Sequence, residues 1–170
     1  WIKMSHFLDL LLCQINPDYL RSLSAYSKVL SQRNELLKRI SQGLAQSKEL
    51  LFWDQQLADY GAILIGVRTE KISELSRSIE SFYQSLSGDS SSVILRYSTK
   101  VTASDASPEK LRDRFRELLT DELPRQIALG ATHIGPHRDD LLVFHQDQPM
   151  GPHSSRGEQR TAAIALRLSE

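Results

Sequence analysis

Residues 16–44 read NPDYLRSLSAYSKVLSQRNELLKRISQGL, and this stretch has the signals of a long helix. Asn16 can cap the helix, Pro17 suits its first position, and the Asp18 carboxylate favours the positive end of the helix dipole. Steps of three and four residues separate the apolar side chains that follow, with Arg33 in one position of the series. These side chains are Leu23, Tyr26, Leu30, Leu37, Ile40 and Leu44. The alternating spacing predicts a helix with a coiled-coil seam.

A second seam of the same kind follows farther along the chain, at Ile65, Ile72, Leu75, Ile79, Phe82 and Leu86. The apolar cluster LLFW at residues 50–53 precedes Asp54 and is interpreted as the junction between the two helices. Helices of about 30 residues would each be about 45 Å long. Two long helices with a short connection usually fold back on each other, so we predict an antiparallel helical hairpin arm.

The second half of the chain alternates signals for strands and helices. A polar linker at residues 87–92 is followed by β-branched and aromatic residues at 93–97, which predict a strand. Ser107 and Pro108 are typical of a helix start, and Gly130 is typical of a helix end. Three further elements are expected: short strands at 132–134 and 141–144, and a last helix that begins near Gly157.

These elements predict an α+β fold. We divide the chain into a helical arm over residues 1–90, a strand-helix connection over 91–130 and a further segment over 131–170. The 21 Lys and Arg residues balance the 21 Asp and Glu residues, so any contact with DNA must come from a local basic patch. No apolar run reaches the ~18 residues of a membrane span, and no membrane partner is expected. The single cysteine, Cys13, excludes an internal disulfide and points to a reducing compartment.

Two dense motifs lie near the end of the chain, GPHRDDL at residues 135–141 and SRGEQRT at 155–161. The second motif immediately precedes an Ala- and Leu-rich helix. Gly157 lets the backbone approach a ligand closely, and the N–H groups of the helix start can bind an anion together with the Ser155 hydroxyl. A capped helix start after a loop explains the same residues without any ligand.

Four histidines and two aspartates around these motifs suggest a metal site: His133, His137, His145, His153, Asp139 and Asp140. The Gly-Pro pair between the first two histidines prevents the helix on which their rings would converge. Adjacent strand residues point to opposite faces, so the two aspartates are expected in a salt-bridged turn rather than as a paired acid and base. We therefore expect no metal site and no catalytic residue.

The densest basic stretch lies in the helix that starts near Ser107, and it contains Lys110, Arg112, Arg114 and Arg116. The first and third of these share one stripe of the helix, and the second and fourth share a neighbouring one. A basic face that contacts DNA phosphates is therefore feasible. A solvated helix face is the other interpretation, and the sequence does not choose between them.

With both motifs together, the chain resembles the RecF family, recombination and repair ATPases related to the SMC and ABC-type ATPases. The family pattern reads Gly-Pro-His-Arg-Asp-Asp-Leu and then Ser-x-Gly-x-Gln-Arg-Thr, and the chain matches it at 135–141 and 155–161. Residues 7–9 and 19–38 are also similar to the first helices of the family. Three positions depart from the pattern, because Met4-Ser5 replace a pair of arginines and Glu158 stands where glutamine is common.

The resemblance implies that residues 131–170 form the signature segment of an ABC/SMC-type ATPase head. In such a head Ser155, Gly157 and Gln159 contact the γ-phosphate of ATP, which is bound with Mg²⁺ at the phosphate loop of the other protomer. The chain has no phosphate-loop motif and no Walker B pattern. We therefore expect a central fragment that is inactive and holds no cofactor by itself.

The resemblance also implies a cytoplasmic protein of DNA replication, recombination and repair, including the SOS response, with weak DNA-dependent ATPase activity. Such a protein would bind DNA in an ATP-dependent manner and form an ATP-dependent homodimer. It would assist recombination-mediator loading at gaps, alongside other recombination-mediator proteins. Two alternatives stay open, a coiled-coil interaction module with no nucleotide role and another SMC-like ATPase head.

Overall fold

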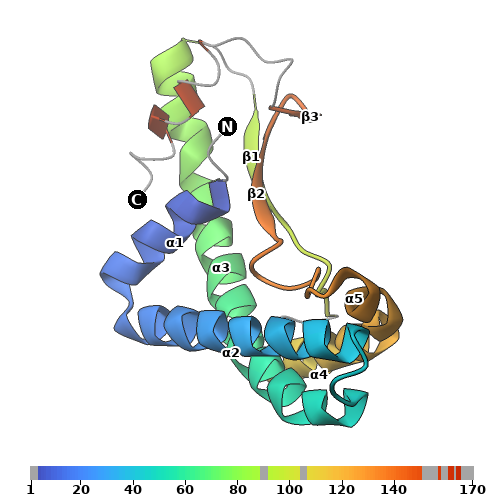
Figure 1. Ribbon diagram of the computed structural model, residues 1–170. Coiled ribbons are helices and arrows are strands. Elements are labelled where there is room, and N and C mark those ends of the chain that lie inside the picture. Colours follow the sequence, from blue (N-terminus) through green and yellow to red (C-terminus); the bar gives the residue numbers. More distant parts are fainter. Residues whose placement is uncertain are drawn as a thin grey trace. The chain divides into compact units, whose positions relative to one another are not determined.

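The computed structural model describes residues 4–88, 92–103 and 107–150, together with Gly157, Thr161, Ala162, Ile164 and Ala165 (Figure 1). Its elements in chain order are α1 (Met4–Ile15), α2 (Pro17–Ser41), the short 3-10 helix η1 (Ser47–Glu49), α3 (Leu50–Ser87), β1 (Val93–Ser98), α4 (Pro108–Asp121), α5 (Leu123–Leu129), β2 (Asp140–His145) and β3 (Gln148–Pro149). The predicted α+β fold class is confirmed, since helices dominate and the strands form one small sheet.

The chain divides into two compact units. The helical unit comprises His6–Val67 and Thr99–Asp139, and the strand unit comprises Trp1–Ser5, Arg68–Ser98 and Asp140–Glu170. Helix α3 contributes its first half to the helical unit and its second half to the strand unit. The functional division into arm, connection and head segment stays a prediction.

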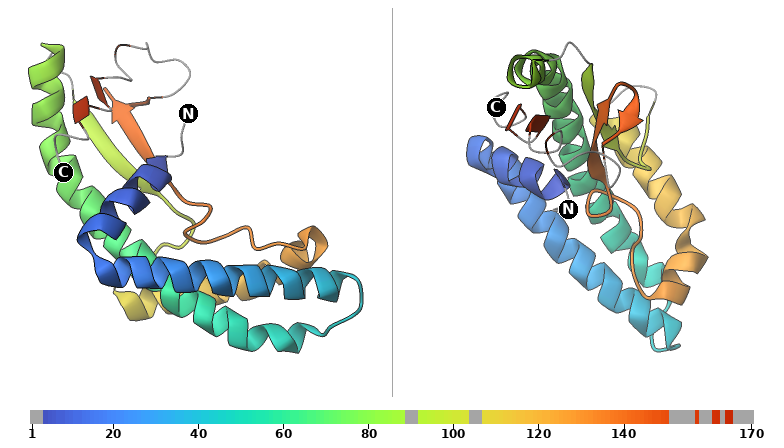
Figure 2. Two further views of the ribbon diagram at one scale, coloured as in Figure 1. Left: turned by 60° about the vertical axis from the view of Figure 1, so that its left-hand side comes forward. Right: turned by 90° about the horizontal axis from the view of Figure 1, so that it is seen from above.

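The helical unit is built on a hairpin of two antiparallel helices. Helix α2 begins where the sequence predicts, because the Asn16 side chain accepts hydrogen bonds from the backbone N–H groups of Asp18 and Tyr19. It runs beside the first half of α3, and a short connection joins the two helices (Figure 2). The predicted helical hairpin is therefore confirmed.

The predicted junction and part of the predicted seam are wrong. Residues 50–53 begin α3, and the connection lies before them, at residues 42–49, where Gly43 has a φ of +73°. Leu44 lies in this connection and is exposed, whereas Val29 and Leu36 are buried. The α2 seam is wider than a coiled-coil stripe because α2 packs against α5 as well as α3.

Helices α4 and α5 occupy the place of the single helix predicted from Ser107. The backbone changes course at Glu122, because Pro124 follows within the first turn of α5 and cannot donate a backbone hydrogen bond. Gly130 ends α5 in the left-handed conformation, as its position predicts. The strand expected at residues 132–134 is absent from this described segment, which forms a loop in which Thr132 bonds to the side chains of Asn34 and Arg33 on α2.

The strand unit contains an antiparallel sheet in the order β1-β2-β3. The predicted strands at 93–97 and 141–144 are confirmed as β1 and β2, which pair from Val93 opposite His145 to Ser98 opposite Asp140. Alternate side chains of β1 and β2 are buried, which is the period-two pattern of a sheet with one covered face. Helix α3 is joined to this sheet by a 3.1 Å hydrogen bond from the Leu95 N–H to the Ser76 hydroxyl.

In the second half of α3 the predicted seam shifts near its end. Ile72, Leu75 and Ile79 are buried as expected, but Tyr83 is buried in place of Phe82, and Leu86 is exposed. The Tyr83 ring lies 5.4 Å from the His145 ring of β2, so contact with the sheet decides which aromatic side chain turns inward. Among the described helices, none combines the length and the hydropathy that crossing a membrane requires.

Candidate functional site

The signature residues can be located only in part. Ser155 and Gln159 lie outside the described residues, and Gly157 lies in helical backbone with its surface exposed. The helix expected to begin near Gly157 stays a prediction, because the residues that would define its start lie outside the described residues. The contact of these three residues with a γ-phosphate stays a prediction.

The GPHRDDL motif begins in a tightly packed turn of the helical unit. Gly135 has a φ of +112°, a backbone conformation that favours glycine. A Cβ atom at this position would lie 2.5 Å from Cζ of Phe115 and 2.7 Å from the hydroxyl oxygen of Tyr26. Gly135 is therefore required both by the backbone angle and by the close approach of two buried aromatic side chains.

His137 fastens the same turn to helix α2. Its Nε2 lies 3.0 Å from the carbonyl oxygen of Thr132, and its Nδ1 lies 2.8 Å from the Tyr26 hydroxyl. A carbonyl can only accept, so Nε2 carries the proton, and Nδ1 of the neutral ring accepts from the tyrosine. Both ring nitrogens of His137 therefore have hydrogen-bond partners within the helical unit.

A buried arginine holds the other end of this loop. The Arg33 side chain is 0% exposed, and its Nε donates to Oδ1 of Asp54 at 2.6 Å. Its Nη1 donates to Oε1 of Gln126 at 2.6 Å and to Oγ1 of Thr132 at 2.7 Å. Asn34 also binds Thr132, since its Oδ1 accepts hydrogen bonds from both the backbone N–H and the hydroxyl of Thr132 at 2.8 Å.

The two aspartates of the motif have separate surroundings. Asp139 is buried at the end of the helical unit, whereas Asp140 starts β2 in the strand unit. Oδ1 of Asp140 accepts from the backbone N–H of Ser5, in the first turn of α1, at 3.0 Å and from that of Leu141 at 2.9 Å. The expected salt-bridged turn is thus wrong for Asp140, which stabilises backbone N–H groups instead.

The candidate metal-binding histidines do not come together. Nε2 of His133 lies 3.0 Å from the carboxylate of Glu122, and His145 lies beside Tyr83. His153 is outside the described residues. Within the described ranges, no group of three or more His, Cys, Asp or Glu side chains is placed to hold a metal ion.

The basic residues of α4 alternate with carboxylates. Arg112 lies 3.9 Å from Asp59 and 3.7 Å from Asp113, and Arg114 lies 3.0 Å from Glu117. Lys110 and Arg116 are exposed. The opposite side of α4 is apolar, and Leu111, Phe115 and Leu119 are buried there.

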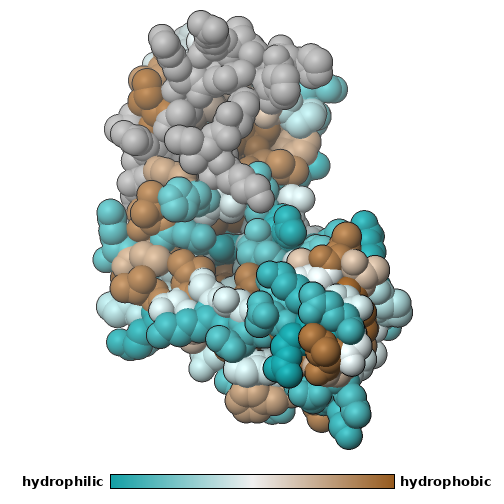
Figure 3. All heavy atoms as spheres, viewed as in Figure 1, coloured by the Kyte–Doolittle hydropathy of each residue, from teal (hydrophilic) through white to brown (hydrophobic). Residues whose placement is uncertain are grey.

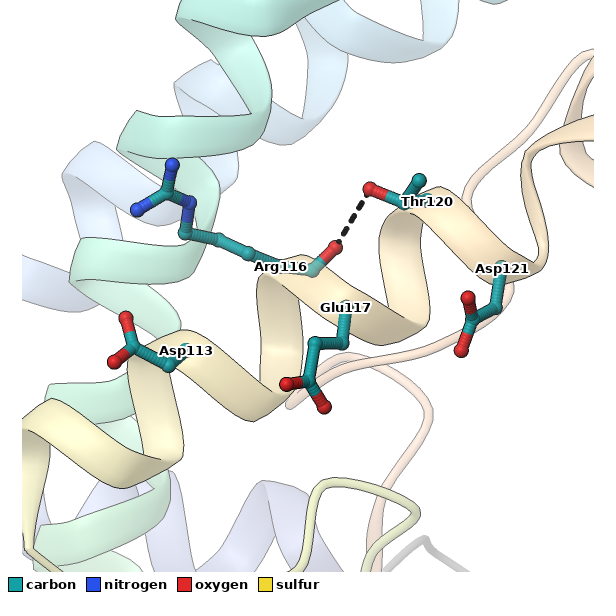
Figure 4. Close-up of a pocket in the computed structure, with 5 residues that line it drawn as sticks. All are labelled: Asp113, Arg116, Glu117, Thr120 and Asp121. Carbon is teal, nitrogen blue, oxygen red and sulfur yellow. Dashed lines mark hydrogen bonds between the residues drawn. The ribbon is translucent and has the colours of Figure 1, made fainter.

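A shallow depression on α4 is lined by both acidic and basic side chains (Figure 4). It is lined by Asp113, Arg116, Glu117, Thr120 and Asp121. In Figure 4 the guanidinium of Arg116 extends away from Glu117 and Asp121. Three carboxylates against one guanidinium make the depression itself unsuitable for a phosphate group. A DNA contact on α4 would have to use basic side chains that extend away from the depression, as that of Arg116 does.

The Arg33 network is the part of the site that the sequence analysis missed. Its signal was present, because Arg33 interrupts an otherwise apolar seam. A charged residue in a buried helical position must find partners in the fold, since an unpaired buried charge is very unfavourable. Sequence reasoning could have asked for those partners, but residues as distant as Gln126 and Thr132 are identified only by the tertiary structure.

The chain was compared with protein-family models and with curated proteins. No family model matches the chain. It is 37% identical over 164 residues to the DNA replication and repair protein RecF of Lachnoclostridium phytofermentans and 39% identical over 173 residues to that of Chloroflexus aggregans. Both matches cover 96% of this chain and 43% of the relative, so the chain spans less than half the length of these curated relatives.

Solved structures show the same similarity. The structure of the recombination mediator protein RecF-ATPrS in the RecFOR pathway superposes with a TM-score of 0.91 at 30% identity, and covers 97% of this chain and 44% of that one. The corresponding RecF-ATP structure gives a TM-score of 0.89 at the same identity.

Proposed function

Since the chain belongs to the RecF family of DNA replication and repair proteins, we propose that it forms the signature-bearing part of an ATP-dependent DNA-binding protein. The observation that carries this proposal is the similarity over 96% of the chain, which includes both motifs. The relatives are named as replication and repair proteins, and two solved relatives are complexes with ATP or ATPrS.

The proposed nucleotide contact uses Ser155, Gly157 and Gln159 of one protomer. These residues would bind the γ-phosphate of ATP, with Mg²⁺, at the phosphate loop of a second protomer. A hydrogen bond to a charged group contributes roughly 1.5–3 kcal/mol, which is enough for nucleotide binding to favour a dimer. The chain lacks a phosphate-loop motif, so it is expected to show no ATP turnover by itself.

The proposed role of the whole protein is to assist recombination-mediator loading at DNA gaps, in the cytoplasm, alongside other recombination-mediator proteins. Lys110, Arg112, Arg114 and Arg116 are the proposed DNA contacts. The exposed position of Lys110 and Arg116 supports a contribution from these two, whereas the carboxylates beside Arg112 and Arg114 weaken the attraction of those two for phosphate.

Sedimentation of the full-length protein with and without ATP tests the nucleotide role. Ser155→Arg places a bulky cation where the opposing nucleotide would dock, so ATP-dependent dimerisation and hydrolysis should be lost while each monomer still binds ATP. If Ser155 only caps a helix, the change costs about 0.5–2 kcal/mol of stability and dimerisation persists. A variant that dimerises and hydrolyses ATP normally would remove the three residues from the proposed site.

A further inference from the structure

The connection of the hairpin carries an exposed apolar surface that the nucleotide and DNA proposals do not use. Leu44 is 66% exposed, Leu51 is 69% exposed and Phe52 is 61% exposed. We call these three residues the apolar tip. Figure 3 shows apolar surface among hydrophilic surface at the lower right of the view, where the hairpin ends in Figure 1. These are the three most exposed large apolar side chains among the described residues, and they lie within nine residues of one another in the sequence.

The apolar tip stands on a rigid base. Leu50, which precedes Leu51, forms a buried cluster with Leu36 and Leu37, and Trp53, which follows Phe52, packs against that cluster. The Trp53 ring in turn meets the Phe52 ring edge to face, with 5.1 Å between the ring centroids. Because the backbone is held by this core, the exposed side chains are pre-organised for contact, which lowers the entropy that a partner must overcome on binding.

Basic residues surround the apolar tip. The carbonyl oxygen of Arg39 accepts a 2.8 Å hydrogen bond from the Leu44 N–H, so these two residues are close neighbours. Lys48 precedes Leu51 and Phe52 by three and four residues, which places it on the same side of the helical backbone. Neither Arg39 nor Lys48 forms an ion pair with any other described residue.

Cations outnumber unpaired carboxylates near the apolar tip. Asp54 is paired with the buried Arg33, whereas Oε1 of Glu49 accepts only from the neutral backbone N–H of Gln46 at 2.8 Å, so Glu49 keeps its negative charge. The two cations Arg39 and Lys48 against the one carboxylate of Glu49 leave a net positive charge beside the apolar tip. A complementary surface would place apolar side chains at its centre and carboxylates around them.

We infer that the apolar tip docks a protein partner whose apolar contact residues are flanked by Asp and Glu side chains. Two leucines and one phenylalanine favour a protein over DNA, because aliphatic side chains gain little from phosphate or base edges. The inference is independent of the proposed nucleotide and DNA roles, since the apolar tip contains none of the residues assigned to them. It gives the hairpin a function as an interaction module.

Fluorescence anisotropy with two synthetic helical peptides tests this inference on the 170-residue chain, without nucleotide or DNA. Both peptides carry the same face of leucines, flanked by glutamates in one and by lysines in the other. We expect the glutamate peptide to bind and the lysine peptide not to bind. Phe52→Ser should weaken binding at least about tenfold, as loss of a central interface side chain does. Lys48→Glu should weaken it as well, with a smaller dependence on salt.

Matched controls keep the result interpretable. Leu10→Ser alters a 54% exposed apolar side chain of the helical unit outside the apolar tip, and Lys28→Glu reverses an exposed charge on α2, away from Lys48 in η1. Both variants should bind the glutamate peptide as the parent chain does. The inference is overturned if neither peptide binds, if both bind equally, or if the controls lose as much affinity as the variants of the apolar tip. Displacement of the peptide by duplex DNA, or its exclusion by self-association in sedimentation, would also overturn it.

Discussion

The hydroxyl of Tyr26 donates a 2.8 Å hydrogen bond to Nδ1 of His137, although 111 residues separate the two in the sequence. The bond joins the first long helix to a turn of the GPHRDDL motif. Since the other ring nitrogen of His137 is bonded to the Thr132 carbonyl, the histidine is held at both ends. Through these two bonds the first half of the motif stabilises the helical unit. Denaturation experiments can measure how much the bonds contribute.

Tyr26→Phe should lower the free energy of unfolding by about 1–3 kcal/mol, because it removes the hydroxyl that bonds to Nδ1 of the half-buried His137. Urea denaturation followed by circular dichroism measures the change. Tyr60→Phe is the matched control, since Tyr60 is half-buried on α3 and its hydroxyl has no hydrogen-bond partner among the described residues. Equal losses in the two variants would mean that the bond to His137 contributes nothing specific.

Arg33→Met should destabilise the helical unit by about 3–5 kcal/mol, the usual effect of breaking a buried ion pair by removing one partner. The change removes the donors to Gln126 and Thr132 as well as the partner of Asp54. Arg21→Met removes an exposed ion pair with Asp18 from the same helix and should have little effect. Thermal unfolding of both variants provides the measurement, and similar midpoints would contradict the role of Arg33 as a buried anchor.

Gly135→Ala should be far more destabilising than Gly43→Ala, although both glycines have positive φ angles. The left-handed conformation costs a non-glycine residue roughly 1–2 kcal/mol at either position. Only at Gly135 does the added Cβ also meet Phe115 and Tyr26, whereas nothing lies within 4 Å of a Cβ at Gly43. In chemical denaturation, adding Phe115→Leu to Gly135→Ala should recover part of the excess loss. Additive effects of the two changes would show that the steric clash is not the cause.

Arg116→Ala in the full-length protein should weaken DNA binding uniformly across sequences and reduce the slope of affinity against salt by about one counterion. Arg114→Ala should have a smaller effect, because Glu117 lies 3.0 Å from its guanidinium and offsets its charge. Filter binding over a range of salt concentrations separates the two. If the slope of affinity against salt is unchanged in both variants, these two arginines of α4 do not contact DNA phosphates.

The sequence by itself determined the elements whose signals are local. The Asn16-Pro17-Asp18 start of α2, the β-branched strand β1 and the left-handed stop at Gly130 follow from caps, propensities and backbone angles within a few residues. The hairpin also followed from the sequence, because two long apolar seams with a short connection have few ways to bury themselves. The match of both motifs to the family pattern was visible in the same way.

Only the tertiary structure decided which residues pack and hydrogen-bond between these elements. Phe115 fills the space that Gly61 and Gly135 leave open, and Arg33 collects partners from α3, α5 and the loop that follows. It also decided that residues 132–134 form a loop rather than a strand, since the N–H and hydroxyl of Thr132 bond to Asn34 and Arg33 of α2 rather than to a neighbouring strand. The physical reason is that burial and hydrogen-bond satisfaction depend on groups brought together from distant positions, and no local pattern in the chain records which groups will meet.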